Sequence, residues 1–331
     1  MRTNHLARSA VPAALAAALL ATAACGTTED TGGGSDDASA ETGPVSTVDS
    51  QGRTVELDAP AKDVVVLEWA EVEITADLGV MPVGVADIEG YHTWAGAAVP
   101  LDDTVTDLGI RHEPSVDAIA ELNPDLVIME IDDEVILDQL EEFVPVLITE
   151  GSNETDNIAR MWDDVDMIAD LLGKTDEAET LKAEFDAKVA DTTAAIEAAG
   201  NTDVPYFIAD GWDDGSTISI RPFGPGSMAG SLAEAVGLAS AWNGETDGAW
   251  GLGSSDVEGM AEFEETELNF IYNNSFKDDI FNEKLVGNPI WDSLKFVEDG
   301  TMYQLPDGAW TFGGPASGEV LLDFYAEVYT S

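Results

Sequence analysis

The stretch that most constrains the fold runs from Thr175 to Ala199 and contains neither glycine nor proline. Four apolar residues can share one stripe of a helix over this range, namely Leu181, Phe185, Val189 and Ile196. Gly200 is a typical residue to end such a helix. At about 1.5 Å per residue, the helix would be a rod of roughly 37 Å.

The residues before this rod alternate short apolar runs with helical patterns. The apolar runs are VVVL (64–67), VGVA (83–86), DLVIM (125–129) and VLIT (146–149). EVEITADLG and PSVDAIAELNP lie between them with helical spacing, the second with a start at Pro114–Ser115 and a stop at Asn123–Pro124. The same alternation returns after residue 204 in YFIA, TISIR, MAGSLAEAVGL, LNFIYN and MYQLP. This rhythm predicts parallel α/β layering.

We therefore predict an α/β fold of two lobes, each a mainly parallel sheet with flanking helices, joined by one long rigid helix. The alternative is a long helix that packs within a single domain. Two lobes on one stiff helix would leave a ligand cleft between them. The predicted divisions are an N-terminal lobe at 45–160, helices including the connecting helix at 161–200, and a C-terminal lobe at 201–331.

The N-terminus has the pattern of a secretory signal. Arg2 and Arg8 precede an apolar run that is too short for a permanent membrane span, and small residues lead to Cys25, the single cysteine. We predict a signal peptide at 1–24, lipidation of Cys25, and a flexible tether at 25–44. The protein would then be anchored to the outer face of the cell membrane. The alternative is ordinary cleavage with Cys25 lost or free.

The formal net charge of −53, from 66 acidic and 13 basic residues, argues against nucleic acid as a partner. Its simplest explanation is an acidic, hydrated surface suited to a salty medium. Arginine is scarce after the signal, occurring at Arg53, Arg111, Arg160 and Arg221. Each of these positions therefore needs a reason.

Signatures of catalysis are absent from the sequence. It has no G-x-S-x-G elbow, no H-E-x-x-H, and no phosphate-binding glycine loop followed by lysine. GPGSMAG (224–230) has the wrong spacing for that loop. After the signal the histidines are His92 and His112, a poor set for a metal site. We predict a protein that is not an enzyme and has no cofactor, and a hydrolase is the alternative of a different class.

Tryptophan is abundant, with eight residues, and most lie in loops or just after strands. Trp162 and Trp291 stand in helical contexts that predict core packing. The others, in LEW, YHTW, DGW, SAWNGE, GAWG and GAWTFGG, are candidates for lining a cleft, because a rigid ring offers a large contact area at little entropic cost.

Long segments of the chain resemble ferric-hydroxamate siderophore-binding proteins, the substrate-binding subunits of bacterial iron ABC importers. The resemblance is carried by VVVLEWAEVEITADLGVMPVGVADIEGYHTWAG, DLGIRHEPSVDAIAELNPDLVI, ISIRPFGPGSMAGSLAEAVGLASAWNGETDGAWG and NPIWDSLKFVEDGTMYQLPDGAWTFGGPAS. It extends from about Val45 to the C-terminus. It implies two α/β lobes bridged by one long helix, a monomer, and delivery of an Fe(III)-siderophore to an ABC permease.

The resemblance also implies roles for individual residues. Arg111 matches the arginine that hydrogen-bonds the hydroxamate oxygens around iron, and Arg221 matches a second ligand-facing arginine of some members. The aromatic cleft positions are Trp69, Trp94, Trp242, Trp250, Trp310 and Phe312. Asp117 and Glu258 match the carboxylates through which each lobe docks on the permease. For Arg111 the alternative is an ordinary ion pair with Glu113 or Asp107.

One departure from the family pattern follows VIM, where members can carry a tyrosine that shares the ligand oxygens. This chain has EIDDEV there, which would place Glu130, Asp132 and Asp133 at the rim of the cleft. The acidic rim suggests a preference for cationic linear hydroxamates such as ferrioxamines. Competing cargoes on the same fold are other iron complexes, haem and cobalamin, and a siderophore hydrolase is the alternative of another class.

The predicted cargo agrees with the residues available. A ferric tris-hydroxamate already fills the six positions of iron, so the protein needs no metal ligands of its own. It needs donors for anionic oxygens, which arginine supplies as a planar fork, and apolar walls for the organic backbone.

Overall fold

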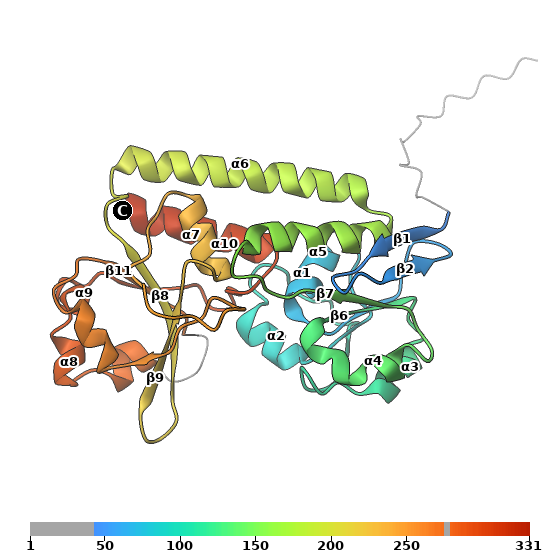
Figure 1. Cartoon of the computed structure of the whole chain (residues 1–331), viewed down its shortest axis with the longest axis horizontal. Coiled ribbons are helices and arrows are strands. Elements are labelled where there is room, and N and C mark those ends of the chain that lie inside the picture. Colours follow the sequence, from blue (N-terminus) through green and yellow to red (C-terminus); the bar gives the residue numbers. More distant parts are fainter. Residues whose placement is uncertain (1–42, 275–278) are drawn as a thin grey trace, which may run out of the picture. The chain divides into compact units, whose positions relative to one another are not determined.

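Two five-stranded β-sheets form the centre of the fold (Figure 1). The computed structural model describes residues 43–274 and 279–331, and it gives only the backbone of residues 132–134. The predicted signal peptide, Cys25 and the tether up to residue 42 lie outside the described residues. The predicted α/β class is confirmed, with one sheet parallel and the other mixed.

The first sheet has the strand order β5-β4-β3-β6-β7 and is parallel throughout. Its strands are β3 (Val64–Val66), β4 (Gly84–Val85), β5 (Thr106–Asp107), β6 (Leu126–Glu130) and β7 (Val146–Thr149). Every residue of β3, β6 and β7 is buried. Continuous burial is typical of parallel strands covered by helices on both faces, which explains why these runs are uniformly apolar rather than alternating.

The helices that accompany this sheet are α1 (Trp69–Asp77), α2 (Ile88–Trp94), α3 (Val116–Leu122), α4 (Leu137–Leu140) and α5 (Asn157–Leu172), with a 3-10 turn η1 (Ile131–Ile136). Helix α3 begins and ends where the sequence predicts. The Ser115 side chain accepts a hydrogen bond from the Ala118 N–H at 3.2 Å, and Asn123 takes a left-handed conformation with φ 48°. A hairpin of β1 (Val45–Val48) and β2 (Thr54–Leu57) precedes the sheet.

The second sheet has the order β10-β9-β8-β11-β12. Its strands are β8 (Tyr206–Asp213), β9 (Ile218–Phe223), β10 (Ser255–Asp256), β11 (Asn269–Tyr272) and β12 (Met302–Gln304). The pairs of β11 with β8 and β12 are parallel, whereas β9 pairs antiparallel with β8 and β10. The cause is the short turn between β8 and β9, where the Asp214 carboxylate accepts from the backbone of Ser216 and Thr217. A turn this short can join only antiparallel strands.

The remaining elements surround this second sheet. They are α7 (Met228–Ala235), the 3-10 turn η2 (Gly259–Phe263), the π-turn η3 (Ile280–Lys284), α8 (Pro289–Asp292), α9 (Lys295–Asp299) and α10 (Pro315–Thr330). In GPGSMAG, Ser227 caps α7 by accepting from the Gly230 N–H at 3.1 Å. That segment is therefore a helix start.

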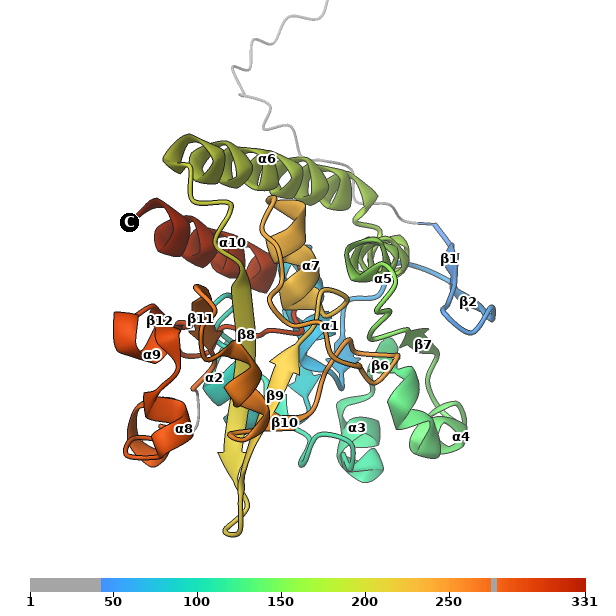
Figure 2. The same cartoon turned by 60° about the vertical axis from the view of Figure 1, so that its left-hand side comes forward.

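The long helix α6 (Thr175–Ala199) spans the range predicted from the sequence and ends at Gly200, which has φ 77°. It packs against both α5 and α10, so it connects the two halves of the chain (Figure 2). Phe185, a residue of α6, is only 1% exposed, and its ring meets that of Trp162 edge-on with the ring centroids 5.5 Å apart. A Cβ atom at Gly318 of α10 would approach the Phe185 ring to 2.9 Å, so the small residue permits the close approach of the two helices.

One hydrophobic core runs through both halves, since Ile128 of β6, Phe185 of α6, Ile208 of β8 and Leu321 of α10 belong to the same cluster. A second cluster covers the other face of the second sheet and includes Trp291. Trp162 and Trp291 are buried, as predicted. The divisions at 45–160, 161–200 and 201–331 remain predictions, because the shared core crosses them.

Candidate ligand-binding cavity

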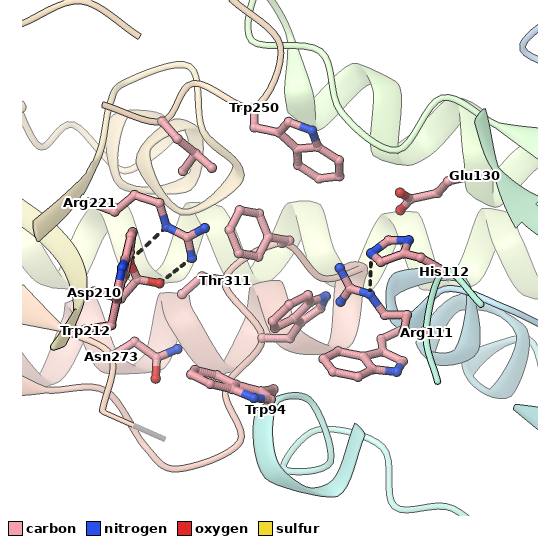
Figure 3. Close-up of a pocket in the computed structure, with 14 residues that line it drawn as sticks. Trp94, Arg111, His112, Glu130, Asp210, Trp212, Arg221, Trp250, Asn273 and Thr311 are labelled. Carbon is pink, nitrogen blue, oxygen red and sulfur yellow. Dashed lines mark hydrogen bonds and ion pairs between the residues drawn. The ribbon is translucent and has the colours of Figure 1, made fainter. Parts of the chain in front are cut away.

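A cavity of about 620 Å³ is lined by residues from both halves of the chain (Figure 3). The lining residues are Trp69, Trp94, Arg111, His112, Glu130, Asp210, Trp212, Arg221, Trp250, Leu252, Asn273, Trp310, Thr311 and Phe312. They include every predicted ligand-binding residue except Trp242. Residues far apart in the sequence are thus brought together as the resemblance implies.

Arg111 reaches the cavity from a tight turn after β5. Gly109 and His112 both have positive φ there, and the Ser115 N–H closes the turn by donating to the Leu108 carbonyl at 2.8 Å. The guanidinium carbon lies 4.5 Å from the centroid of the Trp69 ring and 5.6 Å from that of Trp310. Cation–π contact with the two rings holds the guanidinium at the wall of the cavity.

The acidic partner of Arg111 is Glu68, one residue before α1, with Nε 3.3 Å from Oε1. Arg111 Nε also donates a hydrogen bond to His112 Nε2 at 3.2 Å, and His112 Nδ1 lies 3.3 Å from the same Glu68 oxygen. The ion-pair alternative for Arg111 is therefore present, but with Glu68 in place of Glu113 or Asp107. Because these contacts use Nε, the donors on the two terminal nitrogens remain suited to a ligand.

Arg221 lies on β9 directly opposite Asp210 on β8. Its Nε donates to Asp210 Oδ1 at 2.9 Å and a terminal nitrogen donates to Oδ2, so the pair is bidentate. Burial raises the pKa of Asp210 above its ordinary value, and the nearby Arg221 only partly offsets this effect. The guanidinium also lies 5.6 Å from the centroid of Phe312. Asp210 thus neutralises Arg221 more fully than Glu68 alone would neutralise Arg111.

Aromatic rings connect the two arginines along the cavity wall. Trp69 meets Trp310 at 5.1 Å between ring centroids, Trp310 meets Phe312 at 4.9 Å, and Phe312 meets Trp250 at 5.6 Å. The Trp69 indole N–H donates to the Ala86 carbonyl at 3.2 Å, which holds that ring in place. The result is a continuous apolar wall with a cation at each end.

Glu130 differs from its prediction. It is 5% exposed and lines the cavity at the end of β6, so it does not form an exposed rim. Strand β6 is buried along its whole length, so its last side chain is enclosed as well, which explains the difference. Burial, together with Glu71 and Glu68, raises the pKa of Glu130 well above that of an ordinary glutamate. The side chains of Asp132 and Asp133 lie outside the described residues.

Trp242 is not brought to the cavity. It is 8% exposed within the core of the second sheet, where it meets Phe207 edge-on at 6.0 Å. Three glycines, Gly224, Gly244 and Gly253, crowd around its ring. The segment SAWNGE looked like a cleft loop because its polar residues surround a tryptophan, yet the ring turns inward.

Several lining residues were not singled out from the sequence. Asn273 directly follows β11, and its position at the carboxyl end of that strand was the available signal, whereas Asp210 lies within β8. His112 adjoins Arg111, and Trp212 stood in the group of loop tryptophans without a specific role. In a chain with so many acids, Asp210 could be recognised only from its cross-strand register.

The two predicted docking carboxylates are exposed. Asp117 lies on α3 of the first half, and Glu258 lies directly before η2 of the second. In residues 43–274 and 279–331 no group of histidine, cysteine and acidic side chains is arranged to hold a metal ion. Over the same ranges no helix has the length and apolar character needed to span a membrane.

The sequence profile of the periplasmic binding protein family matches residues 64–309. The chain is 26% identical to the iron(3+)-hydroxamate-binding protein FhuD of Escherichia coli over 254 residues, which covers 77% of this chain and 82% of that protein. It is also 26% identical to the Fe(3+)-citrate-binding protein YfmC of Bacillus subtilis over 321 residues, 96% of each.

Solved structures show the same fold. The Fe3+–Desferal-bound siderophore-binding protein FhuD from Vibrio cholerae superposes with a TM-score of 0.70 at 24% identity, covering 82% of this chain and 98% of that one. The petrobactin-binding protein YclQ from Bacillus subtilis gives a TM-score of 0.71 at 18% identity, with coverages of 87% and 99%.

Proposed function

Because the chain belongs to the periplasmic binding protein family, we propose that it captures ferric hydroxamate siderophores outside the cytoplasm and delivers them to an ABC permease for iron uptake. The observation that carries the proposal is the cavity itself, in which Arg111 and Arg221 stand at the two ends of an aromatic wall. The iron complex is the cargo of such a protein and not a cofactor.

The chemistry of the wall suits this cargo. The terminal donors of Arg111 would bind hydroxamate oxygens, which carry the negative charge of the hydroxamate groups, through charge-assisted hydrogen bonds. The rings of Trp69, Trp310 and Phe312 would pack against the methylene chains of the siderophore. Iron held by six siderophore oxygens would need no side chain from the protein.

Some similar proteins are named for other iron complexes, and those complexes are the competing candidate ligands. YfmC is named for ferric citrate, which is more anionic and would use both arginines as charge partners. Both arginines are already paired with carboxylates, Arg221 by two hydrogen bonds to Asp210. That neutralisation favours a ligand of low net charge over citrate or a ferric tris-catecholate.

The remaining parts of the proposal concern attachment and delivery. Lipidated Cys25 would hold the protein at the outer face of the membrane. Asp117 and Glu258, one on each half and both exposed, would meet basic residues of the permease. The relatives named above are binding proteins, which supports a binding role over the alternative of a siderophore hydrolase.

The test is a tryptophan-fluorescence titration of the purified protein with ferrioxamine B, ferrichrome, ferric citrate, ferric enterobactin, haem and cobalamin. Since Trp69, Trp250 and Trp310 line the cavity, a bound iron complex should quench their emission. Saturable quenching by the hydroxamates at the lowest concentrations supports the proposal. Tighter binding of citrate, enterobactin, haem or cobalamin would replace the cargo, and release of hydrolysed siderophore would favour the enzyme.

A further inference from the structure

Glu130 is a buried acid that lines the cavity at the end of β6. Its carboxyl lies against Gly151, where a Cβ atom would approach it to 2.8 Å, and it is directed into the cavity on the side of Arg111 and His112 (Figure 3). Across the described part of the chain, no hydrogen bond or ion pair is made by this carboxyl. Among the described residues, neither of its oxygens is one of the fully buried side-chain atoms that lack a partner, so they open into the cavity, where a ligand can reach them.

The neighbours of Glu130 decide which protonation state it takes. The charged and titratable groups that face it from the surrounding elements are Glu68 and Glu71 of the α1 region, Arg111 and His112 of the turn after β5, and Arg160 and Asp164 of α5. The two arginines in this group already form ion pairs with other acids. Arg111 pairs with Glu68, and Arg160 pairs with Asp164 at 2.5 Å.

The acids nearest to Glu130 therefore act against its ionisation. Glu71 is itself buried and accepts a hydrogen bond from the Thr149 hydroxyl at 2.8 Å. Burial raises the pKa of Glu130, and the charges of Glu71 and Glu68 raise it further. A carboxyl with a raised pKa keeps its proton at pH values where an ordinary glutamate is charged, and loses it as the pH rises through the higher value.

We propose that Glu130 serves in the cavity as a neutral carboxylic acid, whose O–H donates a hydrogen bond to an anionic oxygen of the bound iron complex. This inference rests on the proposed function, because it needs a ligand with anionic oxygens beside Arg111. A protonated carboxyl at the end of β6 supplies a hydrogen-bond donor on the same side of the cavity as Arg111. An ionised Glu130 would instead repel the same oxygens.

The test compares affinity from mildly acidic to mildly alkaline pH for wild type, Glu130→Gln and His112→Gln. The two probes are ferrioxamine B, which carries an ammonium group, and its N-acetylated form, which does not. Wild-type affinity for both probes should fall about ten- to a hundred-fold as Glu130 ionises. Glu130→Gln keeps a donor that does not ionise, so its affinity should stay nearly level across the same range.

His112→Gln is the control for the neighbouring side chain, because His112 lines the same cavity and accepts a hydrogen bond from Arg111. His112→Gln should therefore retain the fall in affinity that belongs to Glu130. If the fall disappears in His112→Gln and persists in Glu130→Gln, the histidine is responsible and the inference is overturned.

Other outcomes also decide the matter. Affinity for ferrioxamine B that rises with pH, without such a rise for the acetylated form, would make Glu130 the ionised partner of the ammonium group and overturn the neutral-acid role. Binding with the same pH profile in wild type and Glu130→Gln would overturn this inference and leave the proposed function intact. Failure of wild type to bind either probe at any pH would overturn the proposed function, and this inference with it.

Discussion

Replacement of Arg111 gives the most direct test of how the cavity binds its ligand. The guanidinium packs against the Trp69 and Trp310 rings, and the Arg111 side chain is only 25% exposed, so it is partly desolvated before a ligand arrives. Hydrogen bonds to charged groups contribute about 1.5–3 kcal/mol each. Loss of one such bond in Arg111→Ala should weaken ferrioxamine B binding roughly ten- to a hundred-fold.

The same substitution also affects the fold, and the two effects must be separated. Glu68 has a side chain only 4% exposed and would lose its arginine partner. The expected cost lies between that of a surface pair, about 0–1 kcal/mol, and that of a buried pair, about 3–5 kcal/mol. Arg111→Gln combined with Glu68→Gln removes both charges. This double variant should recover stability toward urea without recovering affinity.

Isothermal titration calorimetry and urea unfolding measure the two quantities on the same preparations. Arg53→Ala is the matched control, because Arg53 also forms ion pairs, with Asp49 and Glu141, but does not line the cavity. We expect the control to bind like wild type. An unchanged affinity in the double variant, or an equal loss in Arg53→Ala, would refute the reasoning that Arg111 binds the ligand directly.

Three further results are expected. Burial raises the pKa of Glu73 to about 8, although its carboxyl group accepts a hydrogen bond from Ser317 at the start of α10. The free energy of unfolding should therefore fall as the pH rises from about 4.5 to about 8, by up to ~1.4 kcal/mol per pH unit. In urea titrations Glu73→Gln should flatten this slope, and an unaltered slope would contradict the prediction. Trp242→Ala should lower the unfolding free energy by about 3–5 kcal/mol with ligand affinity nearly unchanged where the variant is folded; a large affinity loss without destabilisation would return Trp242 to the site. Trp310→Ala should weaken binding and reduce ligand-induced quenching, and Trp291→Phe is the control because Trp291 is buried away from the cavity.

Much of the architecture could be predicted because it depends on local properties of the chain. The helix from Thr175 to Ala199, the start of α3 at Ser115 and the apolar strands of the first sheet follow from spacing, capping residues and breakers. The antiparallel β8–β9 pair also had a local signal, since its turn contains Gly215 with φ 84°. That signal was outweighed by the strand–helix rhythm of the rest of the chain.

Fewer features of the candidate site than of the fold could be predicted, because its residues are far apart in the sequence and meet only in the folded chain. The scarcity of arginine drew attention to Arg111, and its predicted ligand role came from the resemblance of the motif around it to the family. The pairing of Arg221 with Asp210 depends on the register of β8 and β9, and the inward turn of Trp242 depends on the glycines around its ring. Neither can be read from neighbouring residues.

The sequence by itself determined the long helix, the start and end of α3, the apolar strands of the first sheet, and which residue types were available for a ligand, because propensity, periodicity and composition act over a few residues. Only the tertiary structure decided which side chains share the cavity and in what state. Glu130 illustrates the difference: its sequence context, EIDDEV, is that of a charged surface segment. Its burial at the end of a central parallel strand, beside Glu68 and Glu71, raises the energy of its charge and favours the neutral acid.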